Sequence, residues 1–244
     1  MSIPSLIVVN ADDIGLRPSI NKAILYCFEQ GYINSTSLLT NMDCFDETVD
    51  FIHKNPVITN IGVHINFAEG KPVTDFKHQQ FLNSDGSWNI DRTRGSLQLL
   101  NKKTYASFLY EINAQIEKAL KADIKINHID SHLHLHTLPA FYNLFINVAK
   151  KHKLKLRLAQ TYKENSYIKF FYRKLINNQI IKNSINYTDL FETVNVFLSQ
   201  KDRVLNGKTV EIMVHPDFNA TGELIDHLGP SSMDNWISYI NENV

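Results

Sequence analysis

The stretch Asn127-His-Ile-Asp-Ser-His-Leu-His-Leu-His-Thr-Leu-Pro139 holds four of the chain's ten histidines. An extended backbone places residues i, i+2 and i+4 on one face. A strand here would therefore gather the carboxylate of Asp130 with the imidazoles at positions 128, 132, 134 and 136. A polar edge-strand face is the alternative, but neither a core nor a solvated surface requires this density of histidine. The stretch predicts a metal site.

Length and composition fit one α/β barrel, a fold that typically needs about 250 residues. The chain has 244 residues, of which 43% are hydrophobic, and its 25 basic and 25 acidic side chains cancel. No global field therefore recruits nucleic acid or an anionic membrane. There is no apolar run of ~20 residues, no basic signal-peptide start, and no paired spacing of Cys27 and Cys44. We expect a soluble cytoplasmic protein without a nucleic-acid or membrane partner.

Four apolar stretches predicted as buried strands each end in a group that can bind metal or transfer a proton. They end, in chain order, at Asp12-Asp13, His64, Asp130-Ser-His132 and His215. Continuous apolar runs are typical of parallel strands that are covered on both faces. Active sites of (β/α) barrels lie at the carboxyl ends of the strands. These groups are therefore expected to meet at one site.

Each group also has a structural explanation. The Asp12-Asp13 pair could cap a helix, although the helical pattern begins only at Pro18. A single histidine in a strand, such as His64, is more often a satisfied core residue. Arg157 follows alternating apolar and basic residues in a predicted strand over 154–159. It could hold an anionic or hydroxyl-rich ligand, or equally form a surface salt bridge.

Two further segments have several interpretations. Residues 69–97 have little periodicity and are predicted to form a lid or cleft wall. Within them, Trp88 could be a sugar-stacking platform or an anchor to the core. Residues 162–187 are aromatic and basic, which is compatible with nucleic-acid binding. We instead predict a helix that packs on the barrel or forms the contact of a homo-oligomer.

Two imidazoles and one carboxylate, with positions left open, form a catalytic rather than a structural metal site. Such a metal lowers the pKa of its bound water and polarises a substrate oxygen. A second aspartate can take the proton of the water, and a histidine across the site can protonate the leaving group. Hydrolysis of a carbonyl compound with an amine leaving group needs these parts. No phosphate-binding loop or nucleophile elbow competes with this interpretation.

Three motifs carry a resemblance to a known family. They are Asn10-Ala-Asp-Asp-Ile-Gly15, Gly62-Val-His-Ile-Asn66 with Glu69-Gly-Lys-Pro72, and Asp130-Ser-His-Leu-His-Leu-His136 with Pro139. From Leu6 to about His215, the chain resembles the YdjC-like carbohydrate deacetylases, which include chitooligosaccharide deacetylases. The resemblance implies one distorted (β/α)-barrel domain over residues 1–244, related to polysaccharide deacetylases. It also implies a divalent metal, usually magnesium, and removal of acetyl groups from N-acetylated sugars.

Roles for individual residues follow from the resemblance by position. It implies Asp13, His64 and His132 as metal ligands, Asp12 as the general base and His215 as the general acid. Asp130 would orient an imidazole, and His134 and His136 would line the cleft or tune their neighbours. The match at His215 is looser, because Asp217 stands where the family commonly has a small residue. Ile14 stands where Phe is frequent, which is a mild change in packing.

The family resemblance and the chemistry of the ligands favour different ions. Magnesium prefers six oxygen ligands, whereas two imidazoles favour zinc, cobalt, nickel or iron. The resemblance therefore implies magnesium, and the ligand chemistry predicts zinc or another transition metal. Two other functions remain open. A phosphoesterase would hold two ions, for which His134 and His136 are additional ligands, and a non-catalytic module would bind metal or sugar without turnover.

Overall fold

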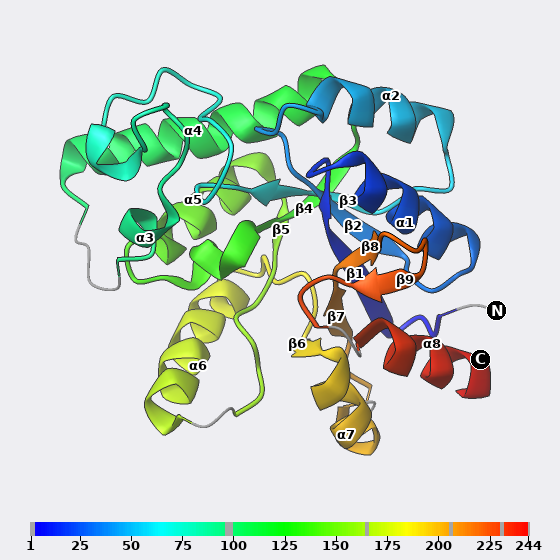
Figure 1. Cartoon of the computed structure of the whole chain (residues 1–244). Helices are drawn as coiled ribbons and strands as arrows, with labels where there is room; N and C mark the ends of the chain where they lie inside the picture. The colour runs from blue at the N-terminus through cyan, green and yellow to red at the C-terminus, as the bar shows by residue number, and fades with distance from the viewer. Residues whose placement is uncertain (1–2, 96–99, 164–165, 205–206, 230–231, 244) are drawn as a thin grey trace.

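The computed structural model describes residues 3–95, 100–163, 166–204, 207–229 and 232–243. Seven parallel strands form a curled sheet, a half-barrel with the order β5-β4-β3-β2-β1-β7-β6 (Figure 1). The strands are β1 (Ile7–Ile14), β2 (Ser35–Leu38), β3 (Ile61–Ile65), β4 (Ile126–Ser131), β5 (Lys155–Leu156), β6 (Leu190–Thr193) and β7 (Val210–Val214). The predicted α/β class and distorted barrel are confirmed.

At the open side of the half-barrel, hydrogen bonds link residues in or next to the two edge strands, β5 and β6. Leu156 in β5 forms a single parallel bridge with Asn186. Farther along, the backbone N–H of Thr161 donates to the carbonyl of Phe191 in β6, at 3.0 Å. These bonds satisfy part of the exposed backbone of the edge strands. The carboxyl ends of the strands thus surround one common region.

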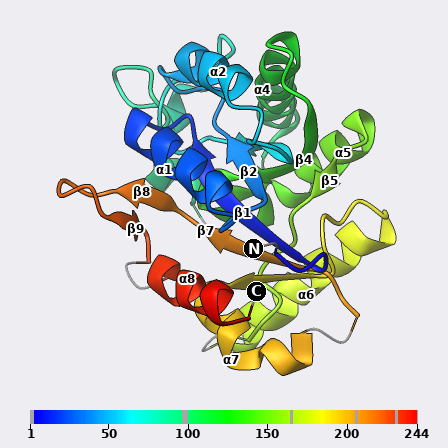
Figure 2. The ribbon, with the colours of Figure 1, turned by 90° about the vertical axis from the view of Figure 1, so that its right-hand side faces the viewer.

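Helices follow most of the strands and cover the outside of the sheet (Figures 1 and 2). They are α1 (Pro18–Glu29), α2 (Phe45–Lys54), α3 (Ile90–Thr93), α4 (Lys102–Lys121), α5 (Tyr142–His152), α6 (Tyr167–Lys182), α7 (Val194–Val204) and α8 (Ser232–Asn243). Two of the helices begin with a recognisable start signal. Pro18 opens α1, and the side chain of Asn101 caps α4 by accepting a hydrogen bond from the N–H of Thr104.

A small antiparallel hairpin is added to this plan after β7. It consists of β8 (Pro216–Phe218) and β9 (Leu224–Asp226) and lies beside α1 (Figure 2). The ring of Phe218 packs edge-on against Tyr26 of α1, with centroids 6.0 Å apart. No helix in the described part of the chain is long and apolar enough to cross a membrane.

The histidine-rich stretch is not one long strand, and this prediction was wrong. The strand β4 ends at Ser131, and residues His132–Thr137 form a 3₁₀ segment in which Leu133 and His134 have φ of 53° and 56°. The hydroxyl of Ser131 accepts a hydrogen bond from the backbone N–H of His136, at 2.8 Å. This local bond competes with the strand ladder and turns the chain. The four imidazoles therefore do not share one strand face.

Several other elements also differ from what the sequence pattern predicts. The strand predicted over 154–159 shrinks to the two residues of β5. The sequence pattern did not reveal β6, β8 or β9, because strands of three or four residues carry too little periodicity to stand out. The helix α7 was not predicted either. Short elements of this kind are defined by their neighbours in space rather than by their own sequence.

The structure shows where Trp88 and the 162–187 segment lie. Trp88 is 2% exposed and stacks on Phe108 at 5.9 Å, so it anchors the loop to the core and cannot stack on a sugar. The 162–187 segment contains the predicted helix, α6, which buries Ile176 and Ile180 against the barrel. Residues 96–97 and 164–165 of these segments lie outside the described residues.

Candidate active site

Two adjacent aspartates at the end of β1 both reach the site because the strand is irregular there. In a regular strand, neighbouring side chains point to opposite faces. The pairing of β1 with β2 shifts between Ala11 and Ile14, and Asp13 has φ of 74°. A non-glycine residue rarely adopts this conformation, and such strain is found mainly at functional sites. The distortion brings both Asp12 and Asp13 next to the histidines of neighbouring strands.

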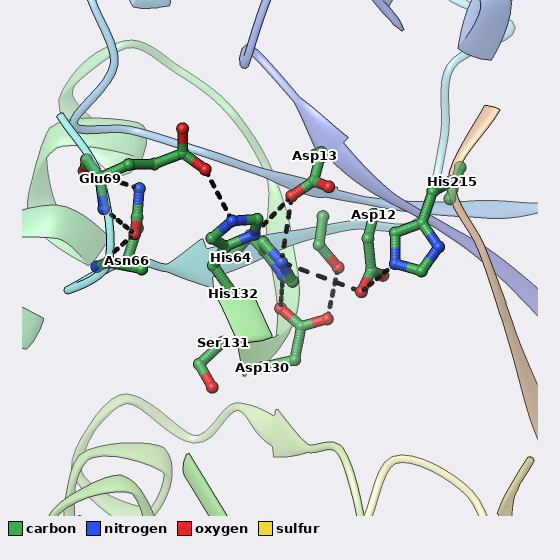
Figure 3. A network of polar contacts seen from close by, with 12 residues as sticks. Asp12, Asp13, His64, Asn66, Glu69, Asp130, Ser131, His132 and His215 are labelled. Atoms are coloured by element: carbon green, nitrogen blue, oxygen red, sulfur yellow. Dashed lines mark hydrogen bonds and ion pairs between the residues drawn. The ribbon is translucent and has the colours of Figure 1, made fainter. Parts of the chain in front are cut away.

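Asp13, His64 and His132 come together at the carboxyl ends of β1, β3 and β4 (Figure 3). The Oδ1 atom of Asp13 lies 3.4 Å from Nε2 of His64 and 2.8 Å from Nδ1 of His132. One potential ligand atom from each residue lies within 4.8 Å of the others, and all three side chains are buried. This triad could hold a metal ion.

The hydrogen bonding around the triad fits a cation. Both carboxylate oxygens of Asp13 are buried and have no hydrogen-bond partner, which is costly unless a positive charge compensates them. Nδ1 of His64 lies 2.7 Å from Oδ1 of Asp130. Because Asp130 is ionised and can only accept, Nδ1 carries a proton, and in the neutral ring Nε2 presents its lone pair towards Asp13. A carboxylate behind a ligating imidazole is the usual arrangement in metal sites.

His132 lies between two acidic side chains. Its Nδ1 faces Asp13, and its Nε2 lies 2.8 Å from Oε1 of Glu69 (Figure 3). Burial opposes protonation of the ring, but the carboxylates of Asp13 and Glu69, each 2.8 Å from one ring nitrogen, outweigh it and raise the pKa of His132 to about 10. The negative charge of this corner therefore attracts a positive charge, either a proton or a metal ion.

Arg157 lies fully buried beneath the site and neutralises a second acidic cluster. Asp12, His64 and Asp130 also place one potential ligand atom each within 4.8 Å. However, the guanidinium donates to both oxygens of Asp12, at 2.6 and 2.7 Å, and contacts Asp130 at 2.8 Å and Glu211 at 2.7 Å. These carboxylates thus share a permanently charged guanidinium, whereas Asp13 faces only imidazoles. Both predicted roles of Arg157, ligand binding and a surface salt bridge, were wrong.

Asp12 is held as an ionised and oriented carboxylate. Burial opposes its ionisation, but the charges of Arg157 and His64 hold the pKa of Asp12 well below its ordinary value. The side chain of Asn10 donates a further hydrogen bond to Oδ1, at 2.8 Å. Oδ2 points towards the other groups, 3.8 Å from Nε2 of His64 and 4.0 Å from Nε2 of His215 (Figure 3).

His215 follows β7 and is fixed by Asp226 of β9. Oδ2 of Asp226 accepts from the backbone N–H of His215 at 2.9 Å, and Oδ1 lies 3.5 Å from Nδ1 of the ring. Burial opposes protonation of His215, but Asp226 and Asp12 outweigh it and raise its pKa above the ordinary value. Asp217, the departure from the family pattern, forms an ion pair with Arg17. That pair ties β8 to the residue before α1.

Asp226 and His227 are residues of this region that the sequence did not reveal. Nε2 of His227 lies 3.6 Å from Oδ2 of Asp13. Both residues follow a turn over 219–223 that is closed by its own hydrogen bonds, including one from Glu223 N–H to Asn219 Oδ1 at 2.9 Å. An Asn-Ala-Thr-Gly turn signals a hairpin. No local signal shows where the second strand of that hairpin would dock.

His128 lies deeper in the barrel than the triad and outside the possible ligand set. Its ring stacks on Tyr187, with centroids 4.2 Å apart, and Nε2 lies 3.3 Å from Oγ of Ser37. The ring lies directly over Gly62, where an added Cβ would come within 2.3 Å of Nε2. His128 is thus a core residue, and Gly62 provides the space for its ring.

A cavity of about 270 Å³ opens over these groups. His134 lines it, whereas His136 lies buried behind it with Nδ1 2.7 Å from Oγ of Ser131. The acidic and imidazole side chains that also line the cavity are Asp12, His64, His132, His215 and Asp226. Acidic and imidazole groups therefore form one wall of a space that a small ligand can enter.

The chain is similar in sequence to proteins named carbohydrate deacetylase. The chain is 28% identical over 214 residues to a carbohydrate deacetylase of Vibrio parahaemolyticus serotype O3:K6, covering 87% of this chain and 78% of the relative. It is also 28% identical over 210 residues to a carbohydrate deacetylase of Oceanobacillus iheyensis, covering 86% and 84%.

A solved structure shares the fold. It is the crystal structure of a proposed cellobiose-phosphate cleavage protein from Enterococcus faecalis V583, with a TM-score of 0.69, 22% identity, and coverage of 88% of this chain and 82% of that one. A family model described as YdjC-like protein matches residues 6–235. Because this match spans most of the sequence, the chain belongs to the YdjC-like protein family.

Proposed function

We propose that this protein is a metal-dependent carbohydrate deacetylase, which hydrolyses the amide of an N-acetylated sugar and releases acetate. The observation that carries the proposal is the buried carboxylate of Asp13, which has no hydrogen bond and lies between His64 and His132. Asp12 and His215 lie next to this triad at the wall of the cavity. The names of the relatives in Vibrio and Oceanobacillus support the same activity.

Asp13, His64 and His132 would hold one divalent ion. When bound, a divalent ion supplies Lewis-acid polarisation of a substrate oxygen and lowers the pKa of water. The two imidazoles favour zinc or another transition metal over magnesium. Asp130 fixes His64 in the tautomer that this role requires.

Asp12 would act as the general base. Its Oδ2 faces the triad and accepts the proton of the attacking water. Arg157 keeps the carboxylate ionised and prevents it from rotating, because it donates to both oxygens. A carboxylate with a lowered pKa is a weak base. It is sufficient here because water near a divalent ion is a stronger acid than bulk water.

His215 would act as the general acid. A raised pKa favours the protonated ring, from which Nε2 can donate its proton to the amine as the C–N bond breaks. Asp226 holds the opposite edge of the ring and sets its orientation. Nε2 of His215 and Oδ2 of Asp12 lie 4.0 Å apart, so acid and base face one small region of the cavity.

The direct test is release of acetate from a panel of N-acetylated sugars, with and without chelator. Asp12→Asn should keep the bound ion and lose about 10²–10⁴-fold in turnover, the typical contribution of a general base. His64→Ala should lose the ion as well. Asp50→Asn, at an exposed position on α2, is the matched control and should behave as wild type.

The alternatives give different results in this test. Two ions per chain would favour a phosphoesterase, for which His134 and His136 are the additional ligands. The second acidic cluster offers no further site, because Arg157 already neutralises Asp12 and Asp130. Metal binding without acetate release from any sugar would favour a non-catalytic module. Full activity of Asp12→Asn would contradict the proposed mechanism.

A further inference from the structure

Glu69, in the loop that follows β3, contacts His132 from the side opposite to Asp13. Oε1 of Glu69 lies 2.8 Å from Nε2 of the ring, and Oδ1 of Asp13 lies 2.8 Å from Nδ1 (Figure 3). The side chain of Glu69 is 46% exposed, whereas that of Asp13 is buried. Glu69 is neither a predicted metal ligand nor a predicted acid or base, so the purpose of this contact is open.

Nδ1 is the atom of His132 that can share an ion with Asp13 and His64. It faces the same Oδ1 atom of Asp13 that lies 3.4 Å from Nε2 of His64. An imidazole that binds a metal through Nδ1 must carry its proton on Nε2. A carboxylate accepts a hydrogen bond from that N–H, so the contact with Glu69 selects the ligating tautomer. In the described part of the chain, Glu69 belongs to neither group of side chains that could hold an ion.

His64 has the reverse arrangement. Its Nδ1 is held by Asp130 at 2.7 Å, and its Nε2 is turned towards Asp13. Each of the two imidazoles therefore has one nitrogen facing Asp13 and the other held by a separate carboxylate. A carboxylate behind a ligating imidazole fixes the orientation of the ring and raises the basicity of the ligating nitrogen.

The backbone of Glu69 is fixed by two buried amide side chains. Oδ1 of Asn66 accepts from the N–H groups of Ala68 and Glu69, at 2.8 and 3.2 Å, and its Nδ2 donates to the carbonyl of Glu69 at 3.0 Å. Asn41 donates to the same carbonyl at 2.9 Å. Asn66 is 0% exposed and Asn41 is 8% exposed. The loop thus holds the main chain in place and leaves the carboxylate to His132, as a supporting group of a metal site requires.

We propose that Glu69 is a positioning residue of the metal site, which accepts a hydrogen bond from Nε2 of His132 and thereby presents Nδ1 to the ion. The inference rests on the proposed function and deepens it. Because Glu69 adds no ligand to Asp13, His64 and His132, the positions for water and substrate stay open. The loop after β3 would then help to retain the metal.

The test measures the Zn²⁺ affinity of metal-stripped protein by competition with a chromophoric chelator. Wild type should bind one ion per chain. Glu69→Ala removes the acceptor and should bind Zn²⁺ about 10–100-fold more weakly, the usual loss for the outer partner of a ligating histidine. Glu69→Gln keeps an oxygen that can accept from Nε2 but loses the charge, so its affinity should lie between those of Glu69→Ala and wild type.

Asp91→Asn is the matched control. Asp91 lies on α3, is exposed, and borders the same surface hollow as Glu69. Its replacement removes one negative charge from this region but leaves the contact between Glu69 and His132 in place. Because exposed charges are screened by salt, Zn²⁺ affinity should stay within about threefold of wild type.

Two further measurements separate positioning from other roles. The visible absorption of Glu69→Gln at saturating Co²⁺ should match that of wild type, because the ligands of the ion are unchanged. Thermal unfolding of the metal-free proteins checks that the variants fold, and affinities are compared at equal folded concentration.

Several results would overturn the inference. A Zn²⁺ affinity of Glu69→Ala within about threefold of wild type would show that the contact does not support the ion. Equal losses in Glu69→Ala and Asp91→Asn would assign the effect to surface charge alone. An altered Co²⁺ spectrum in Glu69→Gln would make Glu69 a ligand. In each case acetate release by wild type would leave the proposed function intact, whereas a wild type that binds no ion would remove both.

Discussion

Replacing Arg157 by Met should destabilise the protein more than any surface ion pair could. The guanidinium contacts Asp12, Asp130 and Glu211, and none of these residues is more than 2% exposed. Burial opposes ionisation of Asp130, but Arg157 and His64 lower its pKa to about 2. Burial raises the pKa of Glu211 to about 7. At pH 7 the variant would therefore retain at least two buried carboxylates without their cation.

Breaking one buried pair typically costs 3–5 kcal/mol, so we expect the free energy of unfolding to fall by at least about 3 kcal/mol. Urea unfolding at pH 7, followed by circular dichroism and tryptophan fluorescence, measures the difference. Arg17→Met is the matched control. It removes the same group from a half-exposed pair with Asp217 and should cost below about 1 kcal/mol.

The pH dependence of this difference provides a second check. In wild type, the lowered pKa of Asp130 contributes stability that is present above its ordinary value of 3.8 and is lost as the pH falls through about 2. In Arg157→Met the carboxylates take up protons at higher pH. The gap between the two proteins should therefore narrow below about pH 4. A loss no larger than that of Arg17→Met would refute the reasoning.

Further substitutions test three individual environments, those of Glu192, Gly62 and Trp88. Burial raises the pKa of Glu192 to about 7 from 4.5, so wild type should lose at most about 3 kcal/mol as the pH rises from 4.5 to 7. Glu192→Gln should flatten this dependence in thermal melts at pH 5 and pH 8, and an unchanged slope would contradict it. Gly62→Ala should cost about 1–3 kcal/mol through its clash with His128; adding His128→Ala should relieve part of that clash, and strict additivity in the double mutant would count against it. Trp88→Ala should cost about 3–5 kcal/mol in urea unfolding. Trp88→Phe should cost much less, because the indole N–H has no partner, and equal losses would mean that this N–H matters.

The sequence predicted the strand ends correctly because buried parallel strands have a clear pattern. Asp12, Asp13, His64, His132 and His215 were all assigned to such ends, and the structure brings them to one cavity wall or next to it. The inference needed only the rule that a parallel sheet gathers its carboxyl ends on one side. The hydrophobic pattern within each segment was sufficient to locate the carboxyl end of its strand.

The remaining features depend on contacts between distant segments. Arg157 lies in an alternating apolar and basic run that resembles an exposed strand, yet it is 0% exposed because three carboxylates from other strands surround it. The break of β4 at Ser131 comes from a side chain that bonds its own backbone five residues later. The contact between His227 and Asp13 spans most of the chain. A linear pattern carries none of this information.

The position of β1 in the sheet has a consequence for synthesis of the protein. It is an inner strand, paired with β2 on one side and with β7, Val210–Val214, on the other. During synthesis, the edge of β1 that pairs with β2 can form its hydrogen bonds early. The edge that pairs with β7 stays unpaired until some two hundred further residues have emerged from the ribosome. An apolar strand with a free edge is a template for aggregation. The nascent chain should therefore depend on chaperones through most of translation, and destabilising changes in β7 should reduce yield in cells before they affect the finished protein.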